Sequence, residues 1–387
     1  AVYLPGKNQI AVIGGLTQAI VGTPITASPS IELFDLTNRQ FIDAQAVGPM
    51  NFARIMPGAT KLEYSGEELL LVTGGTNFDA DPTQAQLSYE VIAPIPTGHI
   101  KDFNQMIGPR YGHEALFVQN QQGARYVYLI GGQYDAVNSE GVFLPFSTQS
   151  LIDIFDVDSG YIVGPPQGRS APAGLETSGR VGHTVHYLPP TELFPASIYV
   201  IGGYQDIQRK TPIARIEVLS AENGAPMTSA ADGFVLAVPR GDHSSAILPD
   251  GRIMVSGGLT KDNAGVAMTM TGTTEIIGAL YPSVGGIPIE GLAPIQSTLV
   301  SQASMTESRF GFKLFSLENE QVMAIGGLRK VANAISEVVI ELAAVATGAV
   351  VDPNAVATAT VAPHAEVYVH HPSDLCQDSQ GFCKDTT

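Results

Sequence analysis

An apolar run that ends in two consecutive glycines occurs six times along the chain. The runs are IAVIGG, LLLVTGG, YVYLIGG, IYVIGG, IMVSGG and VMAIGG. Their second glycines stand at positions 15, 75, 132, 203, 258 and 327. A catalytic or phosphate-binding loop needs one such motif, whereas six copies spread over 387 residues predict a repeated structural unit. The glycine pairs are Gly14 and Gly15, Gly74 and Gly75, Gly131 and Gly132, Gly202 and Gly203, Gly257 and Gly258, and Gly326 and Gly327.

The size of the repeat and the composition of each run predict a β-propeller. The intervals between the second glycines are 60, 57, 71, 55 and 69 residues, which suits a propeller blade with insertions of variable length. Each run is apolar throughout rather than alternating, as expected of a strand that is covered on both faces by neighbouring sheets. One repeat array therefore explains the length better than two or three unrelated domains.

Two charged residues recur in phase with the glycine pairs. An arginine precedes the strand before each of the last five pairs, and in three cases a histidine follows it by three residues. An acidic residue lies near the start of the strand after each pair. The arginines are Arg54, Arg110, Arg180, Arg240 and Arg309, the histidines are His113, His183 and His243, and the first five acids are Glu32, Glu90, Asp153, Glu217 and Glu275.

This pattern resembles the Kelch repeat, in which an Arg-x-x-His opening, a strand such as IYVIGG and a third strand such as IEVLSA form a four-stranded blade. The resemblance implies an all-β, six-bladed propeller of four-stranded antiparallel blades over residues 1–372. The blades would span roughly 1–47, 48–105, 106–172, 173–236, 237–303 and 304–372, with a cysteine-containing tail at 373–387 that is separate or part of the last blade. Kelch blades usually carry a tryptophan in the fourth strand, and this chain has none. Phe41 and Tyr161 are expected to take its place.

The arginine, the glycines and the acid of one repeat should meet at one end of the blade. In an up-and-down sheet, the start of the first strand, the end of the second and the start of the third lie together. A buried arginine paired with a carboxylate would satisfy both charges, and glycines would permit positive φ and close approach of the backbone. We therefore interpret the repeated residues as internal structural links.

The two ends of the chain fit the repeat less well. The first copy begins within its first strand and has no arginine, so Glu32 lacks its counterpart. We expect the chain's C-terminal segment or a partner to supply the missing inner strand. At the other end the sixth acid is Glu337 or Glu366. Glu366 is preferred, because AEVYV resembles the third-strand motif, and residues 328–362 would then be an insertion.

Charge and hydropathy exclude several classes of function. With 20 lysines and arginines against 37 acids, the net charge is −17, which repels nucleic acid and anionic membranes at long range. No apolar run is long enough to span a membrane, and no signal-peptide pattern follows Ala1, so we expect a processed chain.

The only two cysteines, Cys376 and Cys383, lie in the polar tail. A disulfide between them would indicate an oxidising compartment, whereas two free thiols would fit a cytosol. Zinc bound with His370 and His371 is a third interpretation, although the spacing matches no common site. The disulfide is the expectation carried forward.

The loops between each glycine pair and its acid are the predicted functional surface. They contain 13 to 20 residues in the first five repeats, which is longer than a tight turn needs, and long loops on a rigid scaffold collect binding residues. Asp79 and Asp81 are the candidate calcium ligands in one of them. No other metal and no cofactor are expected, because repetition alone explains the three histidines.

We expect a non-catalytic scaffold that is secreted, periplasmic or on a bacterial cell surface, and that binds a protein or a glycan through these loops. The alternative is an enzyme. Kelch-like propellers include copper radical oxidases, but their tyrosine–cysteine cross-link is excluded because no cysteine precedes Cys376. They also include sialic-acid mutarotases, which hold an acidic sugar with arginines in the central channel. The five repeat arginines would serve that role only if they were not engaged internally.

Overall fold

The computed structural model describes most of the chain up to residue 329 and two short segments beyond it. The described residues are 1–17, 26–42, 49–64, 66–77, 87–93, 100–106, 108–120, 123–137, 143–148, 150–163, 175, 179–190, 195–227, 234–248, 251–277, 283–284, 287–288, 298–305, 308–316, 321–325, 327–329, 360–361 and 366–369. They form two compact units, 1–181 with 221–225, and 182–220 with 226–387. Each unit is described by itself.

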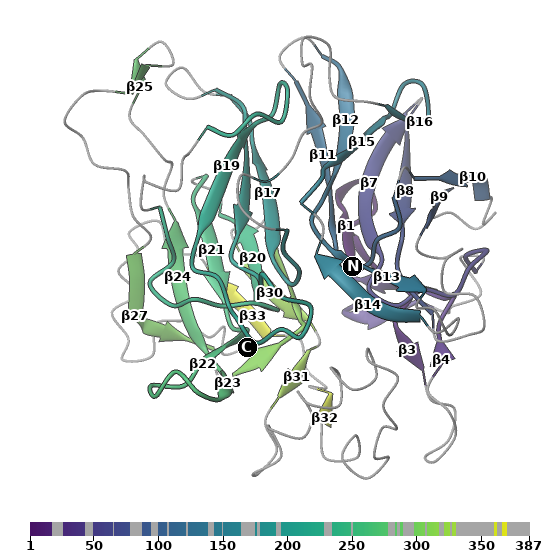
Figure 1. The fold of residues 1–387 in the computed structure, drawn as a ribbon. Helices are drawn as coiled ribbons and strands as arrows, with labels where there is room; N and C mark the ends of the chain where they lie inside the picture. The colour runs from purple at the N-terminus through teal and green to yellow at the C-terminus, as the bar shows by residue number, and fades with distance from the viewer. Residues whose placement is uncertain are drawn as a thin grey trace. The chain divides into compact units, whose positions relative to one another are not determined.

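The first unit contains three sheets in which each glycine-pair strand is the second strand along the chain (Figure 1). The first sheet consists of β1 (Val2–Leu4), β2 (Gln9–Ile13), β5 (Ile31–Asp35) and β6 (Gln40–Phe41), with a short 3-10 helix, η1 (Pro5–Lys7), between β1 and β2. The second consists of β7 (Gly58–Tyr64), β8 (Glu67–Thr73), β9 (Ser88–Ile92) and β10 (Ile100–Gln105). The third consists of β11 (Glu114–Gln119), β12 (Arg125–Ile130), β15 (Asp153–Asp156) and β16 (Tyr161–Val163).

The second unit repeats this arrangement. The fourth sheet consists of β17 (Thr184–Leu188), β18 (Ser197–Ile201) and β19 (Ile216–Ser220). The fifth consists of β20 (Ser244–Ile247), β21 (Ile253–Ser256), β24 (Thr273–Ile277) and β27 (Thr298–Ser304). The sixth consists of β29 (Lys313–Ser316), β30 (Gln321–Ile325) and β33 (Glu366–Val369). Neighbouring strands in these sheets are antiparallel.

The segments between second and third strands form small sheets of their own. These are β3 (Leu16–Thr17) with β4 (Thr26–Ala27), β13 (Gln133–Val137) with β14 (Phe143–Thr148), and β22 (Leu259–Lys261) with β23 (Met268–Met270). In the sixth repeat, β31 (Leu328–Arg329) and β32 (Thr360–Val361) form such a sheet together with β28 (Arg309–Phe310), which precedes the first strand. A further hairpin joins β25 (Ser283–Val284) and β26 (Ile287–Pro288). In Figure 1, β3, β4, β13 and β14 lie at the lower end of the purple-to-blue unit.

Apolar side chains pack between successive sheets of each unit. In β8, Leu70, Leu71 and Val72 are fully buried. Leu70 and Val72 pack with residues of the first sheet, while Leu71 packs with residues of the third. A strand covered on both faces explains why this run is apolar at every position rather than at alternate ones. The fifth sheet is buried in the same way between the fourth and the sixth.

Two expectations about the sheets have clear outcomes. The first sheet has its own first strand, because β1 pairs with β2 through Val2 and Ala11. The expectation that the C-terminal segment or a partner supplies this strand is therefore wrong. Phe41 and Tyr161 do lie in fourth strands, but both side chains are exposed. They do not take the place of a buried tryptophan.

No helix among the described residues is long and apolar enough to cross a membrane.

Candidate functional site

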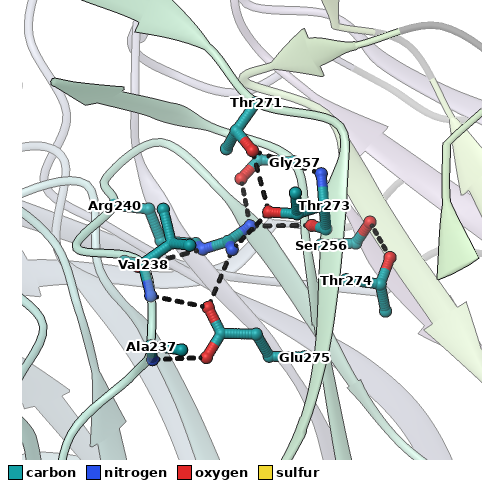
Figure 2. Close-up of polar contacts among 9 residues, drawn as sticks. All are labelled: Ala237, Val238, Arg240, Ser256, Gly257, Thr271, Thr273, Thr274 and Glu275. Carbon is teal, nitrogen blue, oxygen red and sulfur yellow. Dashed lines mark hydrogen bonds and ion pairs between the residues drawn. The ribbon is translucent and has the colours of Figure 1, made fainter. Parts of the chain in front are cut away.

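The guanidinium group of Arg240 is fully buried in the fifth sheet and all of its donors are used (Figure 2). Its N–H groups donate to Val238 O (from Nε, 3.3 Å), Gly257 O (from Nη1, 2.9 Å), Thr273 O (from Nη1, 2.8 Å), Thr273 Oγ1 (from Nη2, 2.7 Å) and Glu275 Oε1 (from Nη2, 2.8 Å). A guanidinium group carries five N–H donors, and five acceptors surround this one. The cluster joins the segment before β20 to the end of β21 and the start of β24.

The carboxylate of Glu275 also binds the backbone that leads to Arg240. Its Oε2 accepts from the N–H of Ala237 at 2.7 Å, and its Oε1 accepts from the N–H of Val238 at 3.1 Å. Figure 2 shows both bonds beside the ion pair. The acid therefore binds one guanidinium group and two backbone N–H groups, which gives a buried charge the charge-assisted partners that it needs.

The second sheet contains the same cluster. Arg54 Nη2 lies 2.7 Å from Glu90 Oε1, and both side chains are fully buried. Arg54 also donates to Gly74 O at 2.5 Å and to Ser88 Oγ at 2.8 Å. Glu90 accepts from two backbone N–H groups, those of residues 51 and 52, at 2.8 and 3.3 Å.

The third sheet contains a looser version of the cluster. Arg110 Nη2 lies 2.8 Å from Asp153 Oδ2. Arg110 Nη1 donates to the carbonyl oxygens of Leu129, Gly131 and Leu151, each at 3.3 Å. Leu151 stands where the other two sheets have Ser88 and Thr273, so this sheet offers the guanidinium no side-chain hydroxyl at that place.

Burial lowers the pKa of Arg54, Arg110 and Arg240 from its ordinary value, and the neighbouring acid opposes this shift in each case. An arginine pKa starts so high that these groups stay charged at neutral pH. Three charged guanidinium groups are thus held inside the sheets by their own acids.

The remaining repeat residues are described in part. Arg180 and Arg309 are buried. Arg180 and Glu217 belong to different units, and within its own unit Glu217 lies 3.9 Å from Arg215. Glu366 on β33 pairs with Ala324 on β30, and Ala324 lies two residues before the glycine pair. Glu90 pairs in the same way with Val72, which lies two residues before its own glycine pair. Glu337, Gly326, Cys376, Cys383, Asp79 and Asp81 lie outside the described residues.

The glycine pairs connect consecutive repeats. The N–H of each second glycine donates to the carbonyl oxygen of the arginine in the next repeat. These bonds are Gly15 to Arg54 (2.8 Å), Gly75 to Arg110 (3.0 Å), Gly132 to Arg180 (2.8 Å), Gly203 to Arg240 (2.8 Å) and Gly258 to Arg309 (2.9 Å). The φ angles of the described pairs lie between 53° and 113°, a region that glycine adopts readily. Arg54, Arg110 and Arg240 therefore contact one pair with their side chains and the preceding pair with their carbonyl oxygens.

A second series of backbone bonds runs through the residues two positions after the arginines. In the first unit, Gly112 donates its N–H to Met56 O at 2.8 Å. In the second unit, Asp242 donates to Gly182 O at 2.8 Å and Gly311 donates to Asp242 O at 2.9 Å. All five residues have φ between 51° and 65°. This series was not predicted from the sequence, although glycines at three of the five positions are in phase with the repeat.

The histidines of the repeat are used in contacts between neighbouring sheets. His113 Nε2 lies 2.7 Å from Thr73 Oγ1, and His243 Nε2 lies 3.1 Å from Thr184 Oγ1. Both imidazoles are buried. Among the described residues, no three side chains of the metal-ligating types gather in one place.

Burial lowers the pKa of His243 well below its ordinary value of 6.5, and the charge of Arg240 adds to this shift. The native state therefore keeps His243 neutral at a pH where the unfolded chain already protonates it. Stability from this residue is complete above pH 6.5 and is lost as the pH falls. We expect the free energy of unfolding to fall by up to about 1.4 kcal/mol per pH unit below that value because of this group.

Urea unfolding at pH 7.5 and 5.5 measures this loss. The variant His243→Gln, which cannot titrate, should lose less stability than the wild-type chain over the same interval. An equal loss in both proteins would show that His243 is not held neutral.

The loop segments of the second unit form a groove of about 900 Å³. It is lined by residues 210–212, by residues 237–239 before Arg240, and by the two arms of the β22–β23 hairpin. Its lining residues include Lys210, Lys261, Asp262 and several threonines. The groove is thus lined by the same kind of segment that the sequence predicts as the functional surface.

No family model matches the sequence, and no curated protein matches it. Solved structures do match the fold. The structure of YjhT has a TM-score of 0.50 and 12% sequence identity, and the match covers 82% of this chain and 90% of YjhT. A fungal alcohol oxidase of the AA5 family, in complex with copper, has a TM-score of 0.49 and 14% identity over 86% of this chain and 70% of the oxidase.

The resemblance to Kelch-type propellers, stated from the repeats, is confirmed at the level of structure. The chain is all-β, and its many small antiparallel sheets match Kelch propeller structures. At such low identity the likeness concerns the fold alone.

Proposed function

We propose that this chain forms a six-bladed Kelch-type propeller that acts as a non-catalytic binding scaffold, in the bacterial envelope or outside the cell. The observation that carries the proposal is the internal use of the repeated arginines. Arg54, Arg110 and Arg240 are buried and paired with acids of their own sheets. Arg54 and Arg240 donate from all three guanidinium nitrogens to acceptors of the fold, and Arg110 donates from both of its Nη atoms, so these groups are engaged internally rather than held out for an acidic sugar. This favours a scaffold over the mutarotase-like alternative.

Six sheets that each contain a glycine-pair strand in second place support the six blades, one for each repeat. The binding surface proposed here is the groove of the second unit and its neighbouring loops. Such a groove suits contacts with a protein or a glycan, because threonines, two lysines and Asp262 line it together with apolar residues. The disulfide between Cys376 and Cys383 and the location outside the cytosol are parts of the same proposal.

A charge-reversal variant tests the role of the groove. We expect Lys210→Glu combined with Lys261→Glu to reduce at least tenfold the amount of partner that the immobilised chain captures from a native envelope extract. Lys7→Glu combined with Lys61→Glu is the matched control, because both residues line a different groove, in the first unit. Equal capture by both variants and the wild-type chain would contradict the groove as the binding surface.

A further inference from the structure

The acid of the repeat binds a short segment of defined geometry, and two sheets show it in full. In the second sheet, Glu90 binds the guanidinium group of Arg54 and the N–H groups of the residues three and two positions before it. In the fifth sheet, Glu275 binds Arg240 and the N–H groups of Ala237 and Val238. The bound unit is therefore a four-residue stretch that bends at its first two residues and ends in arginine.

The first sheet presents the same acceptors in the same register. Glu32 stands opposite Val12, two residues before the glycine pair, as Glu90 stands opposite Val72. The N–H of Gly14 donates to Ser30 O at 2.9 Å, and the N–H of Gly74 donates to Ser88 O at 2.9 Å. The hydroxyl of Ser30 thus occupies the position from which Ser88 contacts the guanidinium of Arg54.

The first sheet differs from its two counterparts in what its acid contacts. The carboxylate of Glu32 is exposed, whereas Glu90 and Glu275 are fully buried. Among the described residues, Glu32 accepts a single weak hydrogen bond, from Ser30 Oγ at 3.5 Å, and forms no ion pair. The hydroxyl of Ser30 is 2.7 Å from Ser28 Oγ instead of a guanidinium nitrogen.

We propose that Gly14 O, Ser30 and Glu32 form a guanidinium-binding socket for an arginine of a segment that is not among the described residues. The carboxylate of Glu32 binds the guanidinium group and the backbone N–H groups two and three residues before it. The carbonyl of Gly14 and the hydroxyl of Ser30 take the remaining donors. Arginine suits these acceptors better than lysine, because its planar guanidinium presents five N–H donors in a fixed fork, whereas an ammonium group has three. The excess of acidic residues in the chain favours a basic segment.

This inference does not rest on the proposed function, because it concerns the first sheet rather than the groove of the second unit. The socket accepts the same chemistry from a separate polypeptide or from a stretch joined directly before Ala1. If the segment precedes Ala1, the pairing of β1 with β2 fixes where its arginine would stand. Val2 pairs with Ala11, and its counterpart Thr60 pairs with Leu71, so Ala1 corresponds to Ala59. The arginine would then stand five residues before Ala1, as Arg54 stands before Ala59.

A blocked synthetic peptide NFARIMPG, which copies residues 51–58, tests the socket in trans. We expect saturable binding to the wild-type chain by NMR titration, and at least tenfold weaker binding to the variant Glu32→Gln. A peptide with citrulline in place of arginine should lose binding to the same extent. Glu63→Gln, which removes an exposed carboxylate of the same unit, should bind the peptide as the wild-type chain does.

A second arm tests the same residues in cis. The eight residues NFARIMPG are joined before Ala1, and the melting temperature is compared with that of a version in which their arginine is glutamine. We expect a higher melting temperature with arginine, and no difference when Glu32→Gln is also present. If binding of the free peptide depends on Glu32, a separate chain can supply the arginine. If only the fused peptide shows a Glu32-dependent effect, the arginine belongs to a segment that precedes Ala1. Absence of a Glu32-dependent effect in both arms would overturn the proposal.

Discussion

Replacing Glu90 by glutamine is expected to lower the free energy of unfolding by about 3–5 kcal/mol, because the substitution leaves the buried guanidinium of Arg54 without its counter-charge. Two backbone N–H groups also lose a charged acceptor. Urea unfolding followed by circular dichroism measures the change.

Glu63→Gln is the matched control for this substitution. It makes the same change of acid to amide in the same unit, but the Lys61–Glu63 pair is exposed to solvent. Exposed pairs of this kind contribute at most about 1 kcal/mol. Equal losses in the two variants would show that the buried pair is no more important to the fold than a surface pair.

Gly258→Ala is expected to destabilise the second unit by about 3–5 kcal/mol, because left-handed strain adds to a steric clash. Gly258 has a φ of 94°, and a Cβ atom there would lie 2.6 Å from Gly241 O and 2.9 Å from His243 Cβ. Backbone atoms cannot move away without breaking the bond from Gly258 to Arg309 O.

Gly251→Ala separates the two causes. Gly251 has a φ of 84° in the same unit, and a Cβ atom there would meet nothing within 4 Å. Its alanine variant should lose only the strain, about 1–2 kcal/mol. A loss as large as that of Gly258→Ala would mean that the close approach of Gly241 and His243 is not what requires glycine at position 258.

The sequence predicted the strands and their order within each sheet well, because the second strands are apolar at every position. The run from Leu69 to Val72 is unmistakable as a strand buried on both faces. Alternation of strand direction then places Arg54, Gly74 and Glu90 at one end of the sheet, and the ion pair follows from charge.

The sequence did not predict the contacts between consecutive repeats. The glycine pair was interpreted as space for the arginine of its own repeat, whereas a Cβ atom on Gly202 would first meet the carbonyl oxygen of Arg240 in the next repeat, at 2.7 Å. Backbone acceptors carry no signature in the side-chain pattern. The hydroxyl two residues before the acid, as in Ser88 and Thr273, was also missed, although its spacing was available.

The start of the first repeat was also predicted incompletely from the sequence. A strand of three residues, Val2–Leu4, is too short for a periodic pattern, so these residues were predicted only as the remainder of a first strand, and another segment was expected to supply the inner strand. The sequence did indicate that Glu32 has no arginine counterpart among the residues before β2, and the structure shows Glu32 exposed.

Arginine modification tests the central claim, that the repeat arginines act inside the fold and do not bind ligand, most directly. The folded chain is treated with phenylglyoxal, and the modified positions are identified by mass spectrometry. We expect Arg39, which is exposed, to react rapidly. We expect the buried arginines Arg54, Arg110, Arg180, Arg240 and Arg309 to stay unmodified until the chain unfolds. Modification of any of these five in the folded chain at the rate of Arg39 would contradict the claim.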